Sequence, residues 1–186
     1  MSEFKLPTEI VELPSKGLLY SEESGLKSGK IEMKYMTAKE EDILTNQSYI
    51  SNGTVLDKLM KSLIVSKINY DDLLIGDKNA VMVAARILGY GSEYTFNYLG
   101  EDYTVDLSQI ENKKVDEEIF QKGVNAFEFT LPHSKNQITF KLLSGKDEKN
   151  IQRELDGLKK INKDNSPELT TRLKYMIASV DRDWEM

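Results

Sequence analysis

A strand pattern that runs directly into a helix start is the feature that most constrains the fold of this chain. Residues 30–36 alternate between apolar and polar side chains, which is the period of a β-strand with one buried face. Thr37 and Glu40 follow at once with the Thr-x-x-Glu spacing of a capping box, in which each side chain satisfies a free backbone donor. The pattern therefore predicts a strand and then a helix to about residue 48.

Apolar residues at helical spacing predict more helices in the N-terminal half. Thr54 repeats the cap signal after a break, and the stripe that follows predicts a helix to Ile64. Residues 70–74 read as a single helical turn that closes at Gly76. Asp77 is then the expected N-cap of a helix to about Leu88.

The period changes to that of β-strands in the middle of the chain. The runs 94–98 and 103–107 predict one hairpin, and the runs 127–131 and 138–143 predict a second with a longer turn. A weaker helical pattern covers 113–125. The expected fold class is α+β, with helices flanking two hairpins that are free to share one small antiparallel sheet.

Two helices are expected after the second hairpin. Ser144 and Asp147 begin the first, which runs to about Lys163. Ser166, followed by a proline, begins a terminal helix whose apolar face extends to Val180.

Four segments, which we expect to form one compact unit, describe this organisation. They are an extended N-terminal arm (1–28), a strand plus helical region (29–92), a two-hairpin region (93–145) and C-terminal helices (146–186). The arm is too apolar for a disordered tail, so it packs on its own domain or on a partner. Its candidate partner contacts are Leu18, Leu19 and Tyr20.

Composition excludes several classes of function. The chain has no cysteine, which leaves no disulfide framework and no thiolate metal site. No apolar run is long enough to span a bilayer, and the formal net charge of −6 opposes binding to a nucleic-acid backbone. Residues 93–126 hold eight acidic and three basic side chains, a net charge of −5. This segment is either a docking site for a basic partner or a solvated surface.

Little in the sequence indicates catalysis. His133 is the only histidine and lies in a turn, where a solvated residue is more typical than one member of a triad. The Gly145–Lys146 pair after Ser144 lacks the upstream glycine and the following hydroxyl of a phosphate-binding loop. We therefore expect no enzyme activity, no cofactor, no metal and no small-molecule substrate.

Four aromatic residues crowd the first hairpin and are the strongest binding candidates. Tyr94, Phe96, Tyr98 and Tyr103 lie within ten residues of one another. Because successive strand residues face opposite ways, we expect a hairpin with apolar side chains on both faces, which either packs internally or docks on a partner.

Three long blocks of the chain read GKIEMKYMTAKEEDILTNQSYISNGTVLDKLMKSLI, INYDDLLIGDKNAVMVAARILGYG and FTLPHSKNQITFKLLSGKDEKNI. These blocks resemble the baseplate hub assembly proteins of T-even-type contractile-tailed bacteriophages. Two shorter stretches, LPSKGLLY and TTRLKYMI, are also similar to that family. The resemblance therefore covers nearly the whole chain.

The resemblance implies a late phage protein, without enzyme activity, that is required to build the central hub of the tail baseplate. Its partners would be other hub or hub-assembly proteins, met in the host cytoplasm during assembly. Two roles stay open: a transient assembly factor or chaperone, and a permanent structural subunit of the hub in the virion tail.

One segment departs from the family. Its members often carry Cys-x-x-Cys pairs after the stretch that reads ARILGYG here, which suggests a small zinc ribbon. The matching segment of this chain, EYTFNYLGEDYTVDLSQI, has no cysteine. The resemblance therefore implies no metal here, and this hairpin must be held by cross-strand packing of its aromatic rings.

Overall fold

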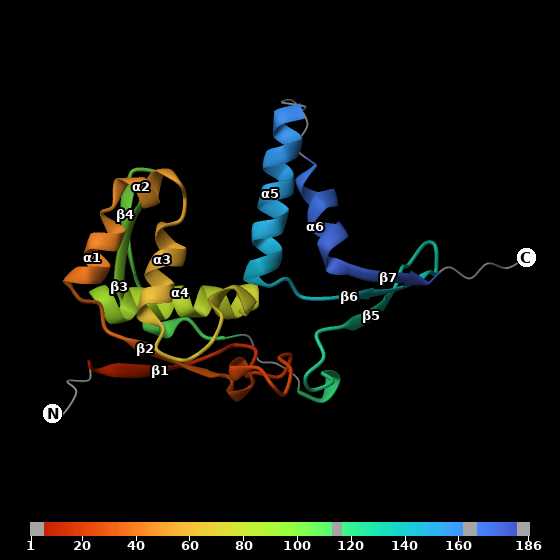
Figure 1. Ribbon diagram of the computed structural model, residues 1–186, viewed down its shortest axis with the longest axis horizontal. Helices are drawn as coiled ribbons and strands as arrows, with labels where there is room; N and C mark the ends of the chain where they lie inside the picture. The colour runs from red at the N-terminus through yellow and green to blue at the C-terminus, as the bar shows by residue number, and fades with distance from the viewer. Residues whose placement is uncertain (1–5, 113–116, 162–166, 182–186) are drawn as a thin grey trace, which may run out of the picture.

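Two lobes make up the molecule, and Figure 1 shows them side by side along its longest axis. The computed structural model describes residues 6–112, 117–161 and 167–181. Helices and small antiparallel sheets both occur in these ranges, so the expected α+β class is confirmed. The larger lobe holds the first four helices, and the smaller lobe holds the last two helices with a three-stranded sheet.

The N-terminal arm is built into the larger lobe. Strand β1 (Thr8–Glu12) pairs antiparallel with β2 (Lys30–Lys34), and a 3₁₀ turn, η1 (Gly25–Ser28), lies between them. Strand β2 was predicted from its alternation, but β1 was not, because two adjacent apolar residues break the alternation of its TEIVE sequence. The partner strand therefore specifies β1 more strongly than its own pattern does.

The predicted capping box is present where β2 leads into α1 (Ala38–Leu44). The backbone N–H of Thr37 donates to Glu40 Oε2 at 3.0 Å. The single helix predicted to residue 48 is in fact two helices, because the side chain of Asn46 caps a new one, α2 (Gln47–Ser51).

The next predicted helix is confirmed as α3 (Val55–Leu63). The side chain of Thr54 makes no capping hydrogen bond there, although this residue does occupy the N-cap position. The predicted single turn is η2 (Tyr70–Asp72), a 3₁₀ turn.

Helix α4 (Ile75–Tyr90) begins earlier than the sequence predicts. Gly76 lies in its first turn instead of closing the preceding one. The prediction of Asp77 as N-cap is wrong: this side chain is 1 % exposed and points toward the arm. It accepts hydrogen bonds from Ser15 Oγ at 2.6 Å and from Tyr20 Oη at 2.6 Å.

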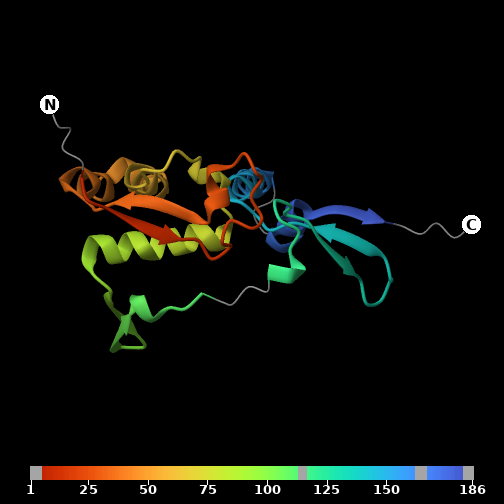
Figure 2. The ribbon, with the colours of Figure 1, turned by 90° about the horizontal axis from the view of Figure 1, so that it is seen from below.

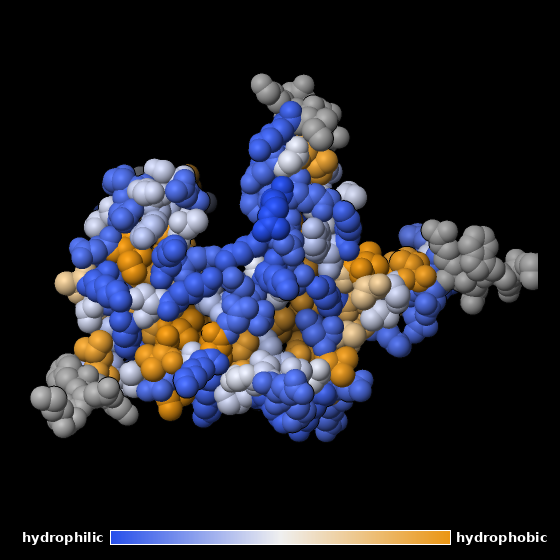
Figure 3. All heavy atoms as spheres, viewed as in Figure 1, coloured by the Kyte–Doolittle hydropathy of each residue, from blue (hydrophilic) through white to orange (hydrophobic). Residues whose placement is uncertain are grey.

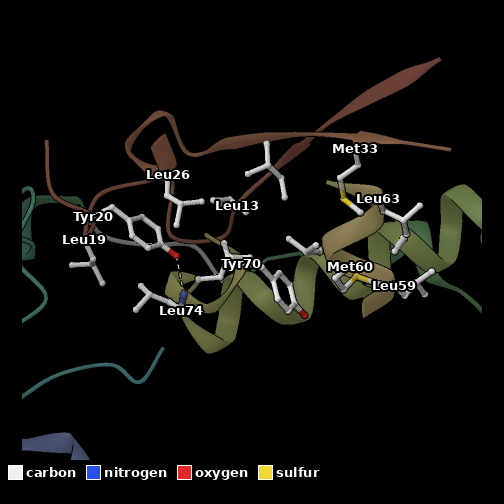
Figure 4. Packing of buried hydrophobic residues seen from close by; sticks show 14 residues of the cluster. Leu13, Leu19, Tyr20, Leu26, Met33, Leu59, Met60, Leu63, Tyr70 and Leu74 are labelled. Carbon is white, nitrogen blue, oxygen red and sulfur yellow. Dashed lines mark hydrogen bonds between the residues drawn. The ribbon is translucent and has the colours of Figure 1, made fainter. Parts of the chain in front are cut away.

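The main core joins the arm to β2, α3, η2 and α4. Figure 4 shows apolar side chains from these elements converging, with Tyr20 Oη accepting a hydrogen bond from the Leu74 backbone N–H at 2.8 Å. Burial on this scale is the main stabilising term of a small domain. The buried hydrophobic residues of this cluster are Leu13, Leu19, Tyr20, Leu26, Ile31, Met33, Leu59, Met60, Leu63, Tyr70, Leu73, Leu74, Val81 and Ala85.

Both predicted hairpins are confirmed, but they do not share a sheet. Strands β3 (Glu93–Tyr98) and β4 (Glu101–Asp106) form a two-stranded sheet of their own, followed by the 3₁₀ turn η3 (Leu107–Gln109). Figure 2 shows this hairpin on the side of α4 away from β1 and β2.

The second hairpin gains its third strand from the end of the chain. Strand β5 (Phe127–Thr130) pairs with β6 (Gln137–Phe140), and the other edge of β6 pairs with β7 (Ile177–Asp181). The terminal helix was predicted to reach Val180, but α6 (Glu168–Met176) stops where β7 begins. The helix ends here because the following residues form backbone hydrogen bonds with β6. The local sequence pattern does not predict this pairing.

Helices α5 (Gly145–Ile161) and α6 complete the smaller lobe, and Figure 3 shows mainly hydrophilic residues over the visible face of α5. The predicted start of α5 is confirmed, because the backbone N–H of Ser144 donates to Asp147 Oδ2 at 2.9 Å while Ser144 Oγ accepts from the Asp147 N–H. The predicted end at Lys163 and the predicted cap at Ser166 lie outside the described residues. Within the predicted helix 113–125, residues 113–116 are also outside, and the rest contains only the 3₁₀ turn η4 (Glu117–Ile119).

A lysine on α5 ties the two lobes together. Lys149 Nζ lies 2.6 Å from Asp57 Oδ2 on α3 and 2.6 Å from Asp71 Oδ1 in η2. Each of these carboxylates also contacts a lysine of the larger lobe: Asp71 contacts Lys61, and Asp57 contacts Lys78. Partly buried charges that form such a network contribute more than isolated surface pairs.

We expect Lys149→Met to lower the free energy of unfolding by about 1 kcal/mol. The methionine keeps an apolar stem, but Asp57 and Asp71 lose the cation that they share. Urea denaturation at low and at high salt measures the effect, which should shrink at high salt. Lys174→Met is the matched control, since it removes an exposed pair with Glu154 inside the smaller lobe; equal losses in the two variants would contradict a role for Lys149 at the junction.

Candidate functional site

The β3–β4 hairpin has one aromatic face. Phe96 pairs with Tyr103 and Tyr94 pairs with Val105 across the strands. Because every second residue of a strand points to the same side, Tyr98 lies on this face too. The register thus brings all four aromatic residues predicted for this hairpin onto one surface.

The other face of the hairpin is polar, so the expectation of two apolar faces is wrong. Thr95 and Thr104 share a hydrogen bond of 2.8 Å between their hydroxyls, and Asn97 Nδ2 donates to Asp102 Oδ1 at 2.9 Å. Within each strand the aromatic residues occupy alternate positions, and the residues of the opposite face all carry polar side chains. This alternation leaves a single apolar face without a cover.

The four rings form a continuous row, which we call the aromatic row. Ring centroids lie 5.9 Å apart for Tyr94 and Phe96, 5.9 Å for Phe96 and Tyr103, and 6.4 Å for Tyr98 and Tyr103, distances at which aromatic rings attract one another. All residues of both strands are nevertheless exposed, Tyr98 by 60 %. The described part of the chain orders these rings without burying them.

The tip of the hairpin is apolar as well. Leu99 and Gly100 form the two-residue turn, both with positive φ (54° and 87°). Asparagine or glycine is the usual first residue of such a turn, since a branched side chain is strained in this region. Leu99 is also 88 % exposed. A strained, exposed leucine is unfavourable for the isolated protein, and such outliers gather at functional sites.

Arg86 of α4 anchors the base of the hairpin. Its guanidinium donates to the carbonyl oxygens of Gly91 and Glu93 at 3.0 and 3.3 Å. The same group lies 5.1 Å from the ring centroid of Tyr90 and 5.6 Å from that of Tyr94, within range of a cation–π interaction. The first ring of the aromatic row therefore already binds a cation.

The candidate residues of the arm lie elsewhere. Leu19 and Tyr20 are each only 8 % exposed and belong to the main core, so in this conformation they are not accessible to a partner. Leu18 is half-buried and lines an apolar pocket of about 480 Å³, together with Phe120 and Leu142. Of the two alternatives for the arm, packing on its own domain accounts for Leu19 and Tyr20.

The residues considered for chemistry are not gathered into a site. His133 is exposed in the turn between β5 and β6, and the Ser144 hydroxyl donates to Asp147 at the start of α5. Residues 6–112, 117–161 and 167–181 contain no group of three or more histidine or acidic side chains placed to hold a metal ion. In the same ranges, no helix combines the length and the apolar character needed to cross a membrane.

Comparison with protein families, curated proteins and solved structures found no match to this chain.

Three residues of the aromatic surface were not among the sequence candidates. Val105 continues the alternation that begins at Tyr103, so the pattern alone could have included it. Leu99 becomes conspicuous only once the strand register places it in the turn. Arg86 precedes Tyr90 by one helical turn, but its contact with Tyr94 depends on how the hairpin folds back against α4.

Proposed function

We propose that this chain is a non-enzymatic assembly factor that builds the baseplate hub of a contractile-tailed phage by docking on another hub protein. The single observation that carries the docking role is the exposed aromatic row with the exposed Leu99 at its tip. A clustered, uncovered apolar surface of this kind marks interaction sites in soluble proteins. Tyrosine and phenylalanine are also enriched where proteins meet.

The assignment to the phage hub rests on the resemblance of the three sequence blocks, not on the fold. The two-stranded sheet adds a physical reason for docking. An isolated hairpin is only marginally stable in water, and a further strand or a covering surface stabilises it. A partner that covers the aromatic row would supply that surface.

Copurification from infected host cells tests the proposal. The tagged chain is expressed during infection, and bound proteins are identified by mass spectrometry. We expect a baseplate or hub protein in stoichiometric amount. Recovery of only host enzymes or nucleic acid, with no tail component, would contradict the assignment.

The same cells distinguish a transient factor from a permanent subunit. Purified finished tails should lack the chain if it acts only during assembly. Its stoichiometric presence in those tails would replace the transient role with that of a structural subunit of the hub.

We expect the double variant Phe96→Ser/Tyr98→Thr to weaken recovery of the partner at least about tenfold, because buried aromatic anchors dominate the energy of protein interfaces. The free energy of unfolding should fall by less than about 1 kcal/mol, since both rings are exposed in the free chain. Phe129→Ser is a matched control: it replaces an exposed ring, 51 % accessible, on the separate β5–β6–β7 sheet. A large loss of thermal stability with unchanged recovery would show that the rings serve folding instead.

A further inference from the structure

We propose that the partner segment that covers the aromatic row is cationic, with lysine or arginine side chains that lie on the exposed rings and reach the Glu101 carboxylate on the same face. This inference rests on the proposed function and adds the chemistry of the bound surface.

The hairpin is acidic and has no positive charge of its own. Residues 93–106 carry four carboxylates and neither lysine nor arginine. Glu101 lies on the aromatic face, because it pairs with Tyr98 across the strands, and its Oε2 accepts a hydrogen bond from Tyr103 Oη at 3.0 Å. A segment that covers the aromatic row therefore meets a negative charge beside the rings. The four carboxylates of the hairpin are those of Glu93, Glu101, Asp102 and Asp106.

Arg86 shows how a cation sits on these rings. Its guanidinium is within 5.6 Å of the Tyr94 ring centroid at one end of the row. Within the described ranges, no lysine or arginine lies over the ring of Phe96, Tyr98 or Tyr103. The attraction that holds Arg86 is available at each of these rings. The next cations along the row would come from the partner.

Charge disfavours the other occupants of this surface. A second copy would bring its own Glu101 against the Glu101 already on this face, with the other three carboxylates of each hairpin close by. Like charges that face one another at an interface disfavour association. Nucleic acid and anionic lipid would meet the same repulsion. A basic protein segment is attracted instead, and long-range attraction speeds its association.

Synthetic peptides provide a direct probe. Three ten-residue peptides, identical except that their alternate residues are arginine, glutamine or glutamate, are titrated into the full chain and followed by backbone amide NMR. We expect the arginine peptide to bind at least about tenfold more tightly than the glutamine peptide. Shifts should be centred on β3 and β4, and the glutamate peptide should not bind. Added salt should weaken the binding.

Charge-neutral variants test the role of the carboxylates. Glu101→Gln/Asp102→Asn should weaken binding of the arginine peptide about fivefold, since each exposed charge pair contributes modestly. The matched control Asp42→Asn/Glu128→Gln removes two exposed carboxylates from α1 and β5, and should leave binding unchanged. Equal binding of all three peptides, equal effects of the two double variants, or shifts centred away from the hairpin would overturn the proposal.

Self-association and other ligands give further outcomes. If sedimentation shows a dimer that Phe96→Ser/Tyr98→Thr dissociates, the occupant is a second copy and the inference fails. Binding of single-stranded DNA or of phosphatidylglycerol vesicles to the hairpin would overturn it in the same way. The inference and the proposed function can fail separately: recovery of a hub protein that depends on Phe96 and Tyr98, but not on Glu101 and Asp102, leaves the function standing and removes the cationic partner.

Discussion

Replacing Glu40 by alanine should lower the free energy of unfolding by about 3 kcal/mol. Its side chain is fully buried, although it is charged. The carboxylate accepts hydrogen bonds from Lys34 Nζ at 2.7 Å and Ser62 Oγ at 2.6 Å, and from the Thr37 hydroxyl and backbone N–H. These donors belong to β2, α3 and the start of α1, so one side chain joins three elements. Removal of the carboxylate leaves a nearly buried ammonium and several other donors without a partner.

Urea denaturation of the variant at neutral pH measures this loss. Glu41→Ala is the matched control: it is the next residue of α1, it is exposed, and its side chain accepts a hydrogen bond from the Tyr90 hydroxyl. We expect the control to change stability by less than about 0.5 kcal/mol. A Glu40→Ala loss as small as that would show that the buried hydrogen bonds contribute little.

The stability that Glu40 contributes should depend on pH. Burial raises the pKa of this carboxyl group, but the hydrogen bonds from Lys34, Ser62 and Thr37 outweigh burial and lower the pKa from 4.5 to about 2. A pKa that is lower in the folded state gives stability that is fully present above the unfolded value and is lost as pH falls through the folded one. The difference between wild type and Glu40→Ala should therefore narrow between pH 4.5 and about 2. A difference that stays constant over this range would contradict an ionised Glu40.

Replacing Asp77 by alanine should cost a similar amount, about 3 kcal/mol. The buried carboxylate holds the arm against α4 by accepting from the backbone N–H and hydroxyl of Ser15 and from the Tyr20 hydroxyl. Burial and the hydrogen bond to Asp77 both raise the pKa of Tyr20, so this hydroxyl stays protonated as a donor. Without the carboxylate, the buried Tyr20 hydroxyl and the two half-buried donors of Ser15 lose this acceptor.

The effect of Asp77→Ala should be concentrated in the arm. Amide hydrogen exchange should speed up at residues 13–20 more than in α5, since the arm loses its attachment to α4. Tyr20→Phe is the graded control: it removes one donor to Asp77 and the acceptor of the Leu74 N–H, and should cost about 1–2 kcal/mol. Uniform acceleration across both lobes would contradict a local role for Asp77.

Much of the fold could be predicted wherever a local rule controls it. The Thr37–Glu40 box and the Ser144–Asp147 pair each involve residues three apart, so the sequence contains the whole interaction. The two hairpins were also predictable, because both strands and their turn are contiguous in the chain. The aromatic residues of the candidate site were found for the same reason.

The incorrect predictions have a different cause, because each of them depends on contacts between segments far apart in the sequence. Aspartate is a residue type that commonly caps helices, which is why Asp77 was predicted as a cap. Hydrogen-bond donors of the arm, 57 and 62 residues away in the sequence, instead hold its side chain in the core. The last residues of α6 gave way to β7 because β6 offers backbone partners there. The buried residues Leu19 and Tyr20 were candidates for a partner because an apolar arm looks the same whether it packs on itself or on another protein.

By itself the sequence determined the α+β class, the starts of α1 and α5 and the alternation that makes one face of the first hairpin aromatic, since each depends on spacing within a few residues. Only the tertiary structure decided which apolar residues remain available. It buries Leu19 and Tyr20 of the arm in the main core and leaves the aromatic row and Leu99 exposed. Burial depends on contacts between segments far apart in the chain. A local sequence pattern therefore does not distinguish an apolar side chain that packs internally from one that stays exposed and available to bind a partner.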